Sequence, residues 1–201
     1  MQEHFGITAA ADADFKPNYN ITPSMQVPVV RRQDAETGMA FCHWGLVPHW
    51  SKADQKLKPI NARAETIESK PFFREAFRSR RCLIPCSGYY EWKTFNGAKQ
   101  PYLIRVSGTG LFAFAGVWDQ WQGADNLVES CAIITTTATD ELRQVHDRMP
   151  VIVPPDLYGD WLQTGGKGYL VPYNGEMEFY PVSKAVNNPR NNSPDLLKRA
   201  G

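Results

Sequence analysis

The sequence lacks the features that mark membrane, secreted or strongly charged proteins. Its 201 residues contain no run of about 20 apolar residues, which excludes a membrane-spanning helix of ordinary length. The first residues, MQEH, lack the charged and apolar regions of a signal peptide, so we expect a cytoplasmic protein. The formal net charge of +1 excludes neither DNA nor protein partners, because a local basic patch can be balanced elsewhere.

Cysteine is scarce and shows none of the spacings that bind zinc or build a disulfide framework. The chain has four cysteines, Cys42, Cys82, Cys86 and Cys131, with no CxxC pair among them. Free cysteine is among the residues most often buried, so we expect four free thiols in the interior. We also expect no metal ion and no cofactor.

The chain does have the composition of a folded domain. Hydrophobic residues make up 42% and aromatic residues 12% of a length that can bury a sizeable core. No repeat or low-complexity segment divides it. We therefore expect one domain over residues 1–201, with an asparagine-containing tail over residues 188–201.

Short apolar runs bounded by turn residues predict mostly strands. Strands are expected at residues 27–30, 39–46, 102–106, 110–118, 128–136 and 178–182. Helices are expected at residues 70–79, 140–146 and 155–162. The first two strands can form a hairpin, and strand follows strand later in the chain, which favours antiparallel pairing. Ser69 and Thr137 stand where caps of the first two helices are expected. The pattern predicts an α+β fold with a mainly antiparallel sheet.

The stretch RCLIPCSGYYEWK at residues 81–93 joins a buried strand to an alternating one. Residues 82–85 form a short apolar run, and a Ser-Gly turn separates them from the second run. There, Glu91 points to one side of a strand and its neighbours Tyr90 and Trp92 to the other. Desolvation among such neighbours raises the pKa of a carboxyl group and suits it to proton transfer near neutrality. An ordinary half-exposed strand with Glu91 in water fits the same alternation.

A long irregular segment follows the second expected strand. Residues 47–64 combine prolines and lysines with Trp50, and Trp44 lies just before them. Loops of this length are often functional, and cations interleaved with aromatic rings are typical of single-stranded nucleic acid binding. A solvated loop with both tryptophans in the core is the alternative.

The segment HDRMP at residues 146–150 lies where a short helix must give way to an extended run. A helix opening near residue 140 has to stop before Pro150, because proline cannot continue it. Positions at such boundaries are common places for site residues, which makes His146 a candidate.

Five stretches in order resemble the SOS-response-associated peptidase (SRAP) family. They are NYNITP at 18–23, WGLVPHW at 44–50 with INARAET at 60–66, CSGYYEW at 86–92, HDRMPVI at 146–152 and PVSKAVNN at 181–188. Together they span nearly everything after Asn18. The resemblance implies a single compact β-rich domain with a barrel-like sheet flanked by short helices. It also implies a DNA-repair protein of the SOS response that binds single-stranded DNA and joins covalently to abasic sites.

The resemblance also assigns roles to residues. Asn61 would hydrogen-bond the sugar-derived adduct, Glu91 would shuttle protons, and His146 would hold the opened sugar or exchange a proton. Imine formation needs one proton removed from an amine and another given to the departing water, which a carboxyl group in an apolar setting can do.

The remaining site residues concern DNA binding. Arg63 and Arg148 correspond to DNA-contacting positions of the family. Asn20, Trp44 and Trp50 lie on the same motif segments, and we expect them at the DNA interface too. The expected partner is therefore single-stranded DNA with abasic sites, bound by a monomer and without a membrane.

The chain departs from the family pattern at its beginning. Family members begin Met-Cys-Gly-Arg, and removal of the initiator Met exposes a Cys that forms a thiazolidine with the ring-opened sugar aldehyde. This chain begins MQEH, so the nucleophilic Cys is absent. The simplest explanation is a start site placed too late or a truncation, in which case residues 1–17 are the remnant of a longer N-terminus.

Three hypotheses remain open from the sequence. The first is an abasic-site-processing protein that crosslinks to DNA when an N-terminal Cys is present, with the peptidase activity that removes the initiator Met. The second is a non-covalent single-stranded DNA-binding module, which Gln2 favours. The third is a hydrolase that uses Cys82 or Cys86 with His146, although no activating partner of either thiol is visible in the sequence.

Overall fold

The computed structural model describes residues 3–7, 16–34, 36–52 and 56–201. Its strands are β1 (Gln26–Gln33), β2 (Glu36–Trp44), β3 (Asn61–Arg63), β4 (Arg81–Cys86), β5 (Tyr89–Phe95), β6 (Ala98–Val106), β7 (Phe112–Gln122), β8 (Leu127–Thr137), β9 (Arg148–Pro150), β10 (Ile152–Val153) and β11 (Met177–Pro181). Its α-helices are α1 (Arg74–Ser79), α2 (Asp140–Arg143) and α3 (Tyr158–Gln163). The 3-10 turns are η1 (Glu3–Phe5), η2 (Pro155–Leu157), η3 (Lys167–Tyr169), η4 (Lys184–Asn187) and η5 (Pro194–Leu197).

Five strands close into a barrel, which confirms the predicted β-rich, barrel-like fold. The ring runs β1, β2, β8, β7 and β4, and the β4–β1 pairing closes it. Four of these pairings are antiparallel, and the β2–β8 pairing is parallel. The expected hairpin of the first two strands is present, with Gln26 opposite His43 and Gln33 opposite Glu36.

Alternating side chains of the barrel strands build two separate apolar layers. One set fills the barrel interior and includes Val29, Cys42, Cys82, Phe114 and Cys131. The other set faces outward, where α1 and α3 cover it with side chains such as those of Phe77 and Trp161. Because the period of a strand is two, β1, β4, β7 and β8 contribute to both layers, and the barrel is packed on its inside and its outside.

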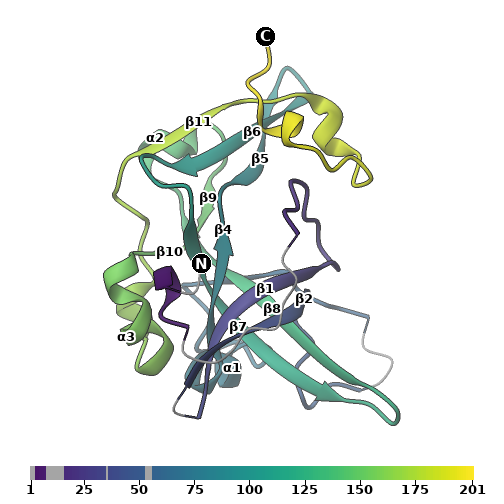
Figure 1. The fold of residues 1–201 in the computed structure, drawn as a ribbon, viewed down its shortest axis with the longest axis vertical. Coiled ribbons are helices and arrows are strands. Elements are labelled where there is room, and N and C mark those ends of the chain that lie inside the picture. The colour runs from purple at the N-terminus through teal and green to yellow at the C-terminus, as the bar shows by residue number, and fades with distance from the viewer. Residues whose placement is uncertain (1–2, 8–15, 35, 53–55) are drawn as a thin grey trace.

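A smaller sheet stands at one end of the barrel. Its strand order is β11, β6, β5, so β5 lies at its edge. Figure 1 shows this sheet above the barrel, with the C-terminal segment lying against it. Leu103 of β6 packs there with Val182, Val186 and Leu196 of the C-terminal segment. Residues 188–201, which we expected to form a tail, thus fold back onto the domain.

The helix boundaries differ from the sequence prediction for local reasons. The first helix begins at Arg74 rather than residue 70, and the Ser69 hydroxyl donates to the Thr66 carbonyl instead of capping it. The cap of α2 is Thr139, whose side chain accepts from the Leu142 N–H, while Thr137 ends β8. Both predicted caps were therefore wrong.

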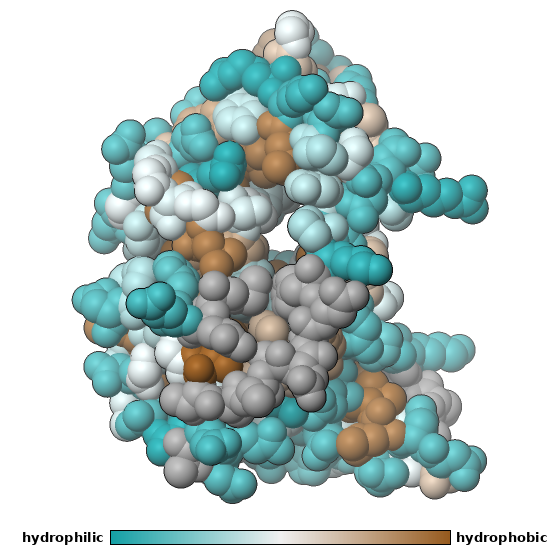
Figure 2. Space-filling model, viewed as in Figure 1, coloured by the Kyte–Doolittle hydropathy of each residue, from teal (hydrophilic) through white to brown (hydrophobic). Residues whose placement is uncertain are grey.

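Two findings concern membranes and metals. No helix among the described residues is long and apolar enough to cross a membrane. In the same part of the chain, no three His, Cys, Asp or Glu side chains are grouped so that they could hold a metal ion. Figure 2 shows a largely hydrophilic face on which apolar surface is confined to separate small areas.

Candidate functional site

A pocket of about 360 Å³ lies beside the edge strand β5. Its lining residues are Glu91, Trp92, Lys99, His146 and Asn187. Glu91 and Trp92 are consecutive and point to opposite faces of β5, yet both reach the pocket because it opens at the edge of the sheet. We call this the Glu91 pocket.

Burial controls the chemistry of the Glu91 carboxyl group. Desolvation raises its pKa above the usual value, while the nearby His146 and a hydrogen bond from the Trp92 backbone N–H offset part of that shift. Tyr89, on the same face of the strand, packs edge to face against Phe114 at 5.6 Å between ring centroids. These rings keep water from one side of the strand. Glu91 therefore has apolar neighbours on that side and still opens into the pocket.

His146 faces Glu91 from the segment between α2 and β9. Its Nδ1 lies 3.1 Å from the backbone nitrogen of Arg148, which donates to it, and the ring is exposed. Nδ1 also lies 3.1 Å from the Arg148 carbonyl oxygen, so the Arg148 backbone engages it in either tautomer of the ring. The arrangement places a carboxyl group of raised pKa and an imidazole in one pocket, which is the equipment of general acid-base catalysis.

The C-terminal segment supplies another wall of the pocket. Asn187, at the end of η4, accepts a hydrogen bond from the Trp92 indole N–H at 2.8 Å. The segment around it is held by the buried Asn20, whose side-chain amide lies 3.1 Å from the carbonyl oxygens of Val186, Asn188 and Asn191. The Asn20 amide thus positions the segment that carries Asn187.

β3 and β9 flank β8 on its two sides, and their side chains form a polar surface. Asn61 and Arg63 of β3 are both exposed, with the buried Ala62 between them. Arg148 of β9 makes a two-pronged ion pair with Glu65, at 2.6 Å and 3.0 Å, and also donates to the Thr135 carbonyl at 2.7 Å. The Arg148 guanidinium lowers the pKa of Glu65. Arg63 therefore offers the more accessible cation of this surface.

The two tryptophans differ in environment. Trp44 is half-buried, and its indole N–H donates to the carbonyl of Ile60 at 2.9 Å, so it fixes the residue before Asn61. Trp50 is 48% exposed and meets Phe72 edge to face at 5.6 Å between ring centroids. Of the two, Trp50 is the ring that a DNA base could reach.

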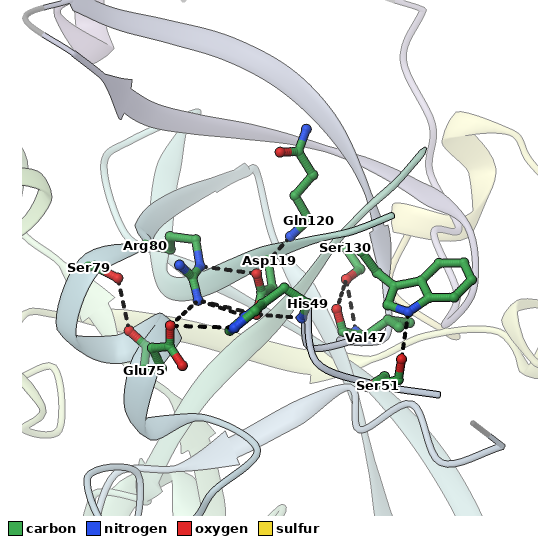
Figure 3. Close-up of polar contacts among 10 residues, drawn as sticks. Val47, His49, Ser51, Glu75, Ser79, Arg80, Asp119, Gln120 and Ser130 are labelled. Atoms are coloured by element: carbon green, nitrogen blue, oxygen red, sulfur yellow. Dashed lines mark hydrogen bonds and ion pairs between the residues drawn. The ribbon is translucent and has the colours of Figure 1, made fainter. Parts of the chain in front are cut away.

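A buried charge network holds the loop that carries Trp50. Figure 3 shows Asp119 between His49 and Arg80. Asp119 is 3% exposed and accepts from both the backbone N–H and the ring of His49 at 3.1 Å, and Arg80 Nε lies 3.1 Å from its other oxygen. Glu75 of α1 extends the network, with its carboxylate 3.5 Å from His49 Nε2.

The same loop is tied down at two further points. The Val47 N–H donates to the Ser130 hydroxyl at 2.8 Å, and the Trp121 indole N–H donates to the Ser51 carbonyl at 2.8 Å (Figure 3). Residues 47–51 are therefore held in one conformation by hydrogen bonds to β7 and β8.

Comparisons with known proteins decide the family. The SOS response associated peptidase (SRAP) family matches residues 1–189. The chain belongs to the SRAP family. Two similar relatives are the abasic site processing proteins YoqW and YoaM of Bacillus subtilis, which are 38% and 39% identical to it. The matches cover 93% and 92% of this chain and 88% and 86% of the relatives. A crystal structure of a Bacteroides thetaiotaomicron protein superposes with a TM-score of 0.80 at 28% identity, over 88% of this chain and 82% of that one.

Within this SRAP domain, the structure groups five of the predicted site residues in two places and leaves the other three apart. Glu91 and His146 share the Glu91 pocket. Asn61, Arg63 and Arg148 lie on the neighbouring surface of β3 and β9. Asn20 and Trp44 make internal hydrogen bonds, and Trp50 stands on the fastened loop. None of these contacts tests a role in DNA binding or catalysis, so those roles stay predictions.

Several site residues escaped sequence reasoning. Lys99 and Asn187 line the pocket, and Glu65 pairs with Arg148. Asn187 and Glu65 stand within the PVSKAVNN and INARAET stretches that carried the resemblance, so their motifs pointed at them. Lys99 had no such signal, because only the pairing of β5 with β6 brings it to the pocket.

The thiols are poorly suited to nucleophilic catalysis. Three of them, Cys42, Cys82 and Cys131, are buried inside the barrel, and all four cysteines are free. Burial raises the pKa of Cys42 to about 12 and that of Cys82 and Cys86 well above the usual range. Thiolates are the reactive form, so this environment disfavours a Cys-His hydrolase.

Proposed function

We propose that this SRAP-family chain acts at abasic sites in DNA and binds them in single-stranded form. The support is twofold. Its relatives are named as abasic site processing proteins, and its Glu91 pocket pairs a carboxyl group of raised pKa with an imidazole. The pairing is the single observation that carries the proposal, because reaction at a sugar aldehyde depends on proton transfer.

The chemistry assigned to the pocket follows from the ring-opened form of an abasic site. The aldehyde of this form condenses with an amine, which in the family is that of an N-terminal Cys. The amine nitrogen loses a proton, and the former aldehyde oxygen is protonated and leaves as water. Glu91 near its raised pKa gives that proton and later takes one back, and His146 holds the sugar hydroxyl through Nε2. Asn61 and Arg63 then bind the sugar and the adjoining phosphate.

Covalent capture needs one further group. A thiazolidine requires an amine and a thiol on the same residue, as an N-terminal Cys provides. We expect a polypeptide with Gln at position 2 and no Cys before it to bind the lesion without forming a thiazolidine. We expect no heat-stable shifted band on a denaturing gel with an abasic oligonucleotide. A chain extended by a segment that begins with Cys, as in the family, should give one. A stable band from the 201-residue chain itself would contradict this chemistry.

The binding claim is tested by fluorescence anisotropy with labelled oligonucleotides. Single-stranded DNA with a stable abasic analogue should bind better than blunt duplex, with affinity falling as salt rises. Arg63→Ala should weaken binding several-fold because an exposed cation is lost. The matched control is Arg32→Ala, an exposed arginine of β1 that pairs locally with the Asp34 carbonyl. Equal affinity for all DNA forms, unaffected by Arg63→Ala, would overturn the proposal.

A further inference from the structure

One face of β5 leads from the Glu91 pocket to the tip of the β5–β6 hairpin. Alternate residues of a strand share a face, so Glu91, Lys93 and Phe95 form one row, which we call the β5 row. Alternate residues lie about 6.8 Å apart along a strand, which places Phe95 about 14 Å along the strand from Glu91. The row carries an acid, a cation and an aromatic ring in that order.

The tip of the hairpin is rigid and presents an aromatic ring to solvent. Asn96 and Gly97 both have positive φ, 48° and 75°, and Phe95 pairs with Ala98 across them. These are the features of a two-residue type I′ turn, which holds the strands in register. Phe95 is 68% exposed, more than any other large hydrophobic side chain among the described residues. A ring that packs so little adds little to the core, and its face is open to a ligand.

Two lysines flank the strand between the pocket and the ring. Lys93 stands in the β5 row, half-exposed, midway between Glu91 and Phe95. Lys99 lies opposite Thr94 on β6 and lines the pocket. Because Thr94 is one residue beyond Lys93, the two cations project from opposite faces of the hairpin at nearly the same height. Lys93 alone therefore lies on the face of the β5 row, where it would meet a phosphate bound between the pocket and Phe95.

We propose that the β5 row is a subsite for the nucleotide next to the abasic site. Lys93 binds the phosphate that links this nucleotide to the lesion, and the base of the nucleotide stacks on Phe95. The order along the row matches the order along a DNA strand, in which the sugar at the pocket is followed by a phosphate and then by the next base. Any base can stack on the ring, because every base has a π-face. The subsite therefore distinguishes single-stranded from duplex DNA and does not distinguish one base from another. The inference rests on the proposed function.

The two contacts predict different experimental signatures on a labelled single strand of about 15 nucleotides with a central abasic analogue. Phe95→Ala should raise Kd about 5-fold to 100-fold, the usual cost of losing one stacked base, and leave the salt dependence unchanged. Lys93→Gln should reduce the slope of log K against log salt by about 0.7, the value for one phosphate contact on a single strand. Phe95→Trp should keep parent affinity, because a larger ring stacks at least as well.

Leu127→Ala is the matched control. Leu127 is 52% exposed on the separate β7–β8 hairpin, so losing it should change neither Kd nor the salt slope. A second probe carries 2-aminopurine beside the lesion. Its fluorescence should be quenched on binding to the parent chain and less quenched with Phe95→Ala.

The outcomes separate the two proposals. If the parent chain binds the abasic strand while Phe95→Ala and Lys93→Gln leave Kd, quenching and salt slope unchanged, the subsite is wrong and the proposed function stands. If the parent chain itself prefers no single-stranded form, the proposed function fails and the subsite with it. Losses confined to these variants, with Leu127→Ala at parent affinity, support the subsite.

Discussion

Replacing Asn20 tests whether this residue contacts DNA or holds the C-terminal segment in place. The side chain is 4% exposed, and its amide lies 3.1 Å from three backbone carbonyls, those of Val186, Asn188 and Asn191. These carbonyls flank Asn187, which lines the Glu91 pocket. Asn20→Ala removes the donor to all three acceptors, of which the bond to Val186 is buried and the other two are partly buried.

The expected loss of stability follows from these contacts. A hydrogen bond contributes about 0.5 to 1.5 kcal/mol net, and a buried acceptor left without its donor adds a penalty of about 1 to 3 kcal/mol. Two N–H groups serve three carbonyls, so we expect Asn20→Ala to lower the free energy of unfolding by about 2 to 4 kcal/mol. Asn20→Asp is nearly the same size but has no N–H group, and its charge would face three carbonyl oxygens. It should be the less stable variant of the two.

Urea denaturation measures the effect directly. The control is Asn18→Ala, because the exposed Asn18 accepts a single bond from the Asn20 backbone N–H and should cost less than about 1 kcal/mol. The reasoning fails if Asn20→Ala unfolds at the parent concentration of urea, or if Asn20→Asp is as stable as the parent. Parent-like stability with loss of single-stranded DNA binding would instead make Asn20 a DNA contact.

Two further predictions concern buried charge. The raised pKa of Glu91 means that the folded state holds its proton to higher pH than the unfolded state, so ionisation costs stability as pH rises through that range. Glu91→Gln should therefore raise the free energy of unfolding at pH 7 and leave it unchanged below about pH 4, where both states are protonated; a loss at pH 7 would contradict this. Asp119→Ala should cost about 1.5 to 3 kcal/mol in urea denaturation, because Arg80 and His49 lose their buried partner and keep only the exposed Glu75. The control is Asp140→Ala, which removes the exposed ion-pair partner of Arg143 and should cost under about 1 kcal/mol. Equal losses for the two variants would show that Asp119 contributes no more than an ordinary surface charge.

Much of the fold could be predicted from the sequence, because strand signals here are local. The hairpin of β1 and β2 and the three strands β6, β7 and β8 follow from apolar runs between turn residues. The parallel pairing of β2 with β8 could not be predicted, since it joins His43 to Ser130, which lie far apart in the sequence. The start of α1 was misplaced and the cap of α2 was assigned to Thr137, because spacing alone does not distinguish how the Ser69 and Thr139 hydroxyls are used.

The candidate site could likewise be predicted where it depends on neighbouring residues, but not where it depends on distant segments. The apolar setting of Glu91 is local, since Tyr89 and Tyr90 adjoin it, and the sequence therefore indicated a raised pKa. The positions of Lys99 and Asn187 depend on strand pairing and on the return of the C-terminal segment, neither of which leaves a periodic signal. Trp44 and Asn20 stood in family motifs, but a motif does not tell a residue that touches a ligand from one that holds the chain behind it.

The position of the pocket explains why such supporting residues are needed. Its walls come from an edge strand, a segment after a helix and the C-terminal turn η4, and none of these belongs to the closed barrel. Each wall is instead held by one specific contact: Trp92 to Asn187, the Arg148 N–H to His146, and the Asn20 amide to the carbonyls around Asn187. A closed barrel has no free edge that could open for a DNA strand, whereas an edge strand exposes backbone and alternate side chains together. The pocket is therefore accessible because it lies outside the barrel, and these hydrogen bonds fix its geometry, so variants of these contacts should disturb the pocket before they unfold the barrel.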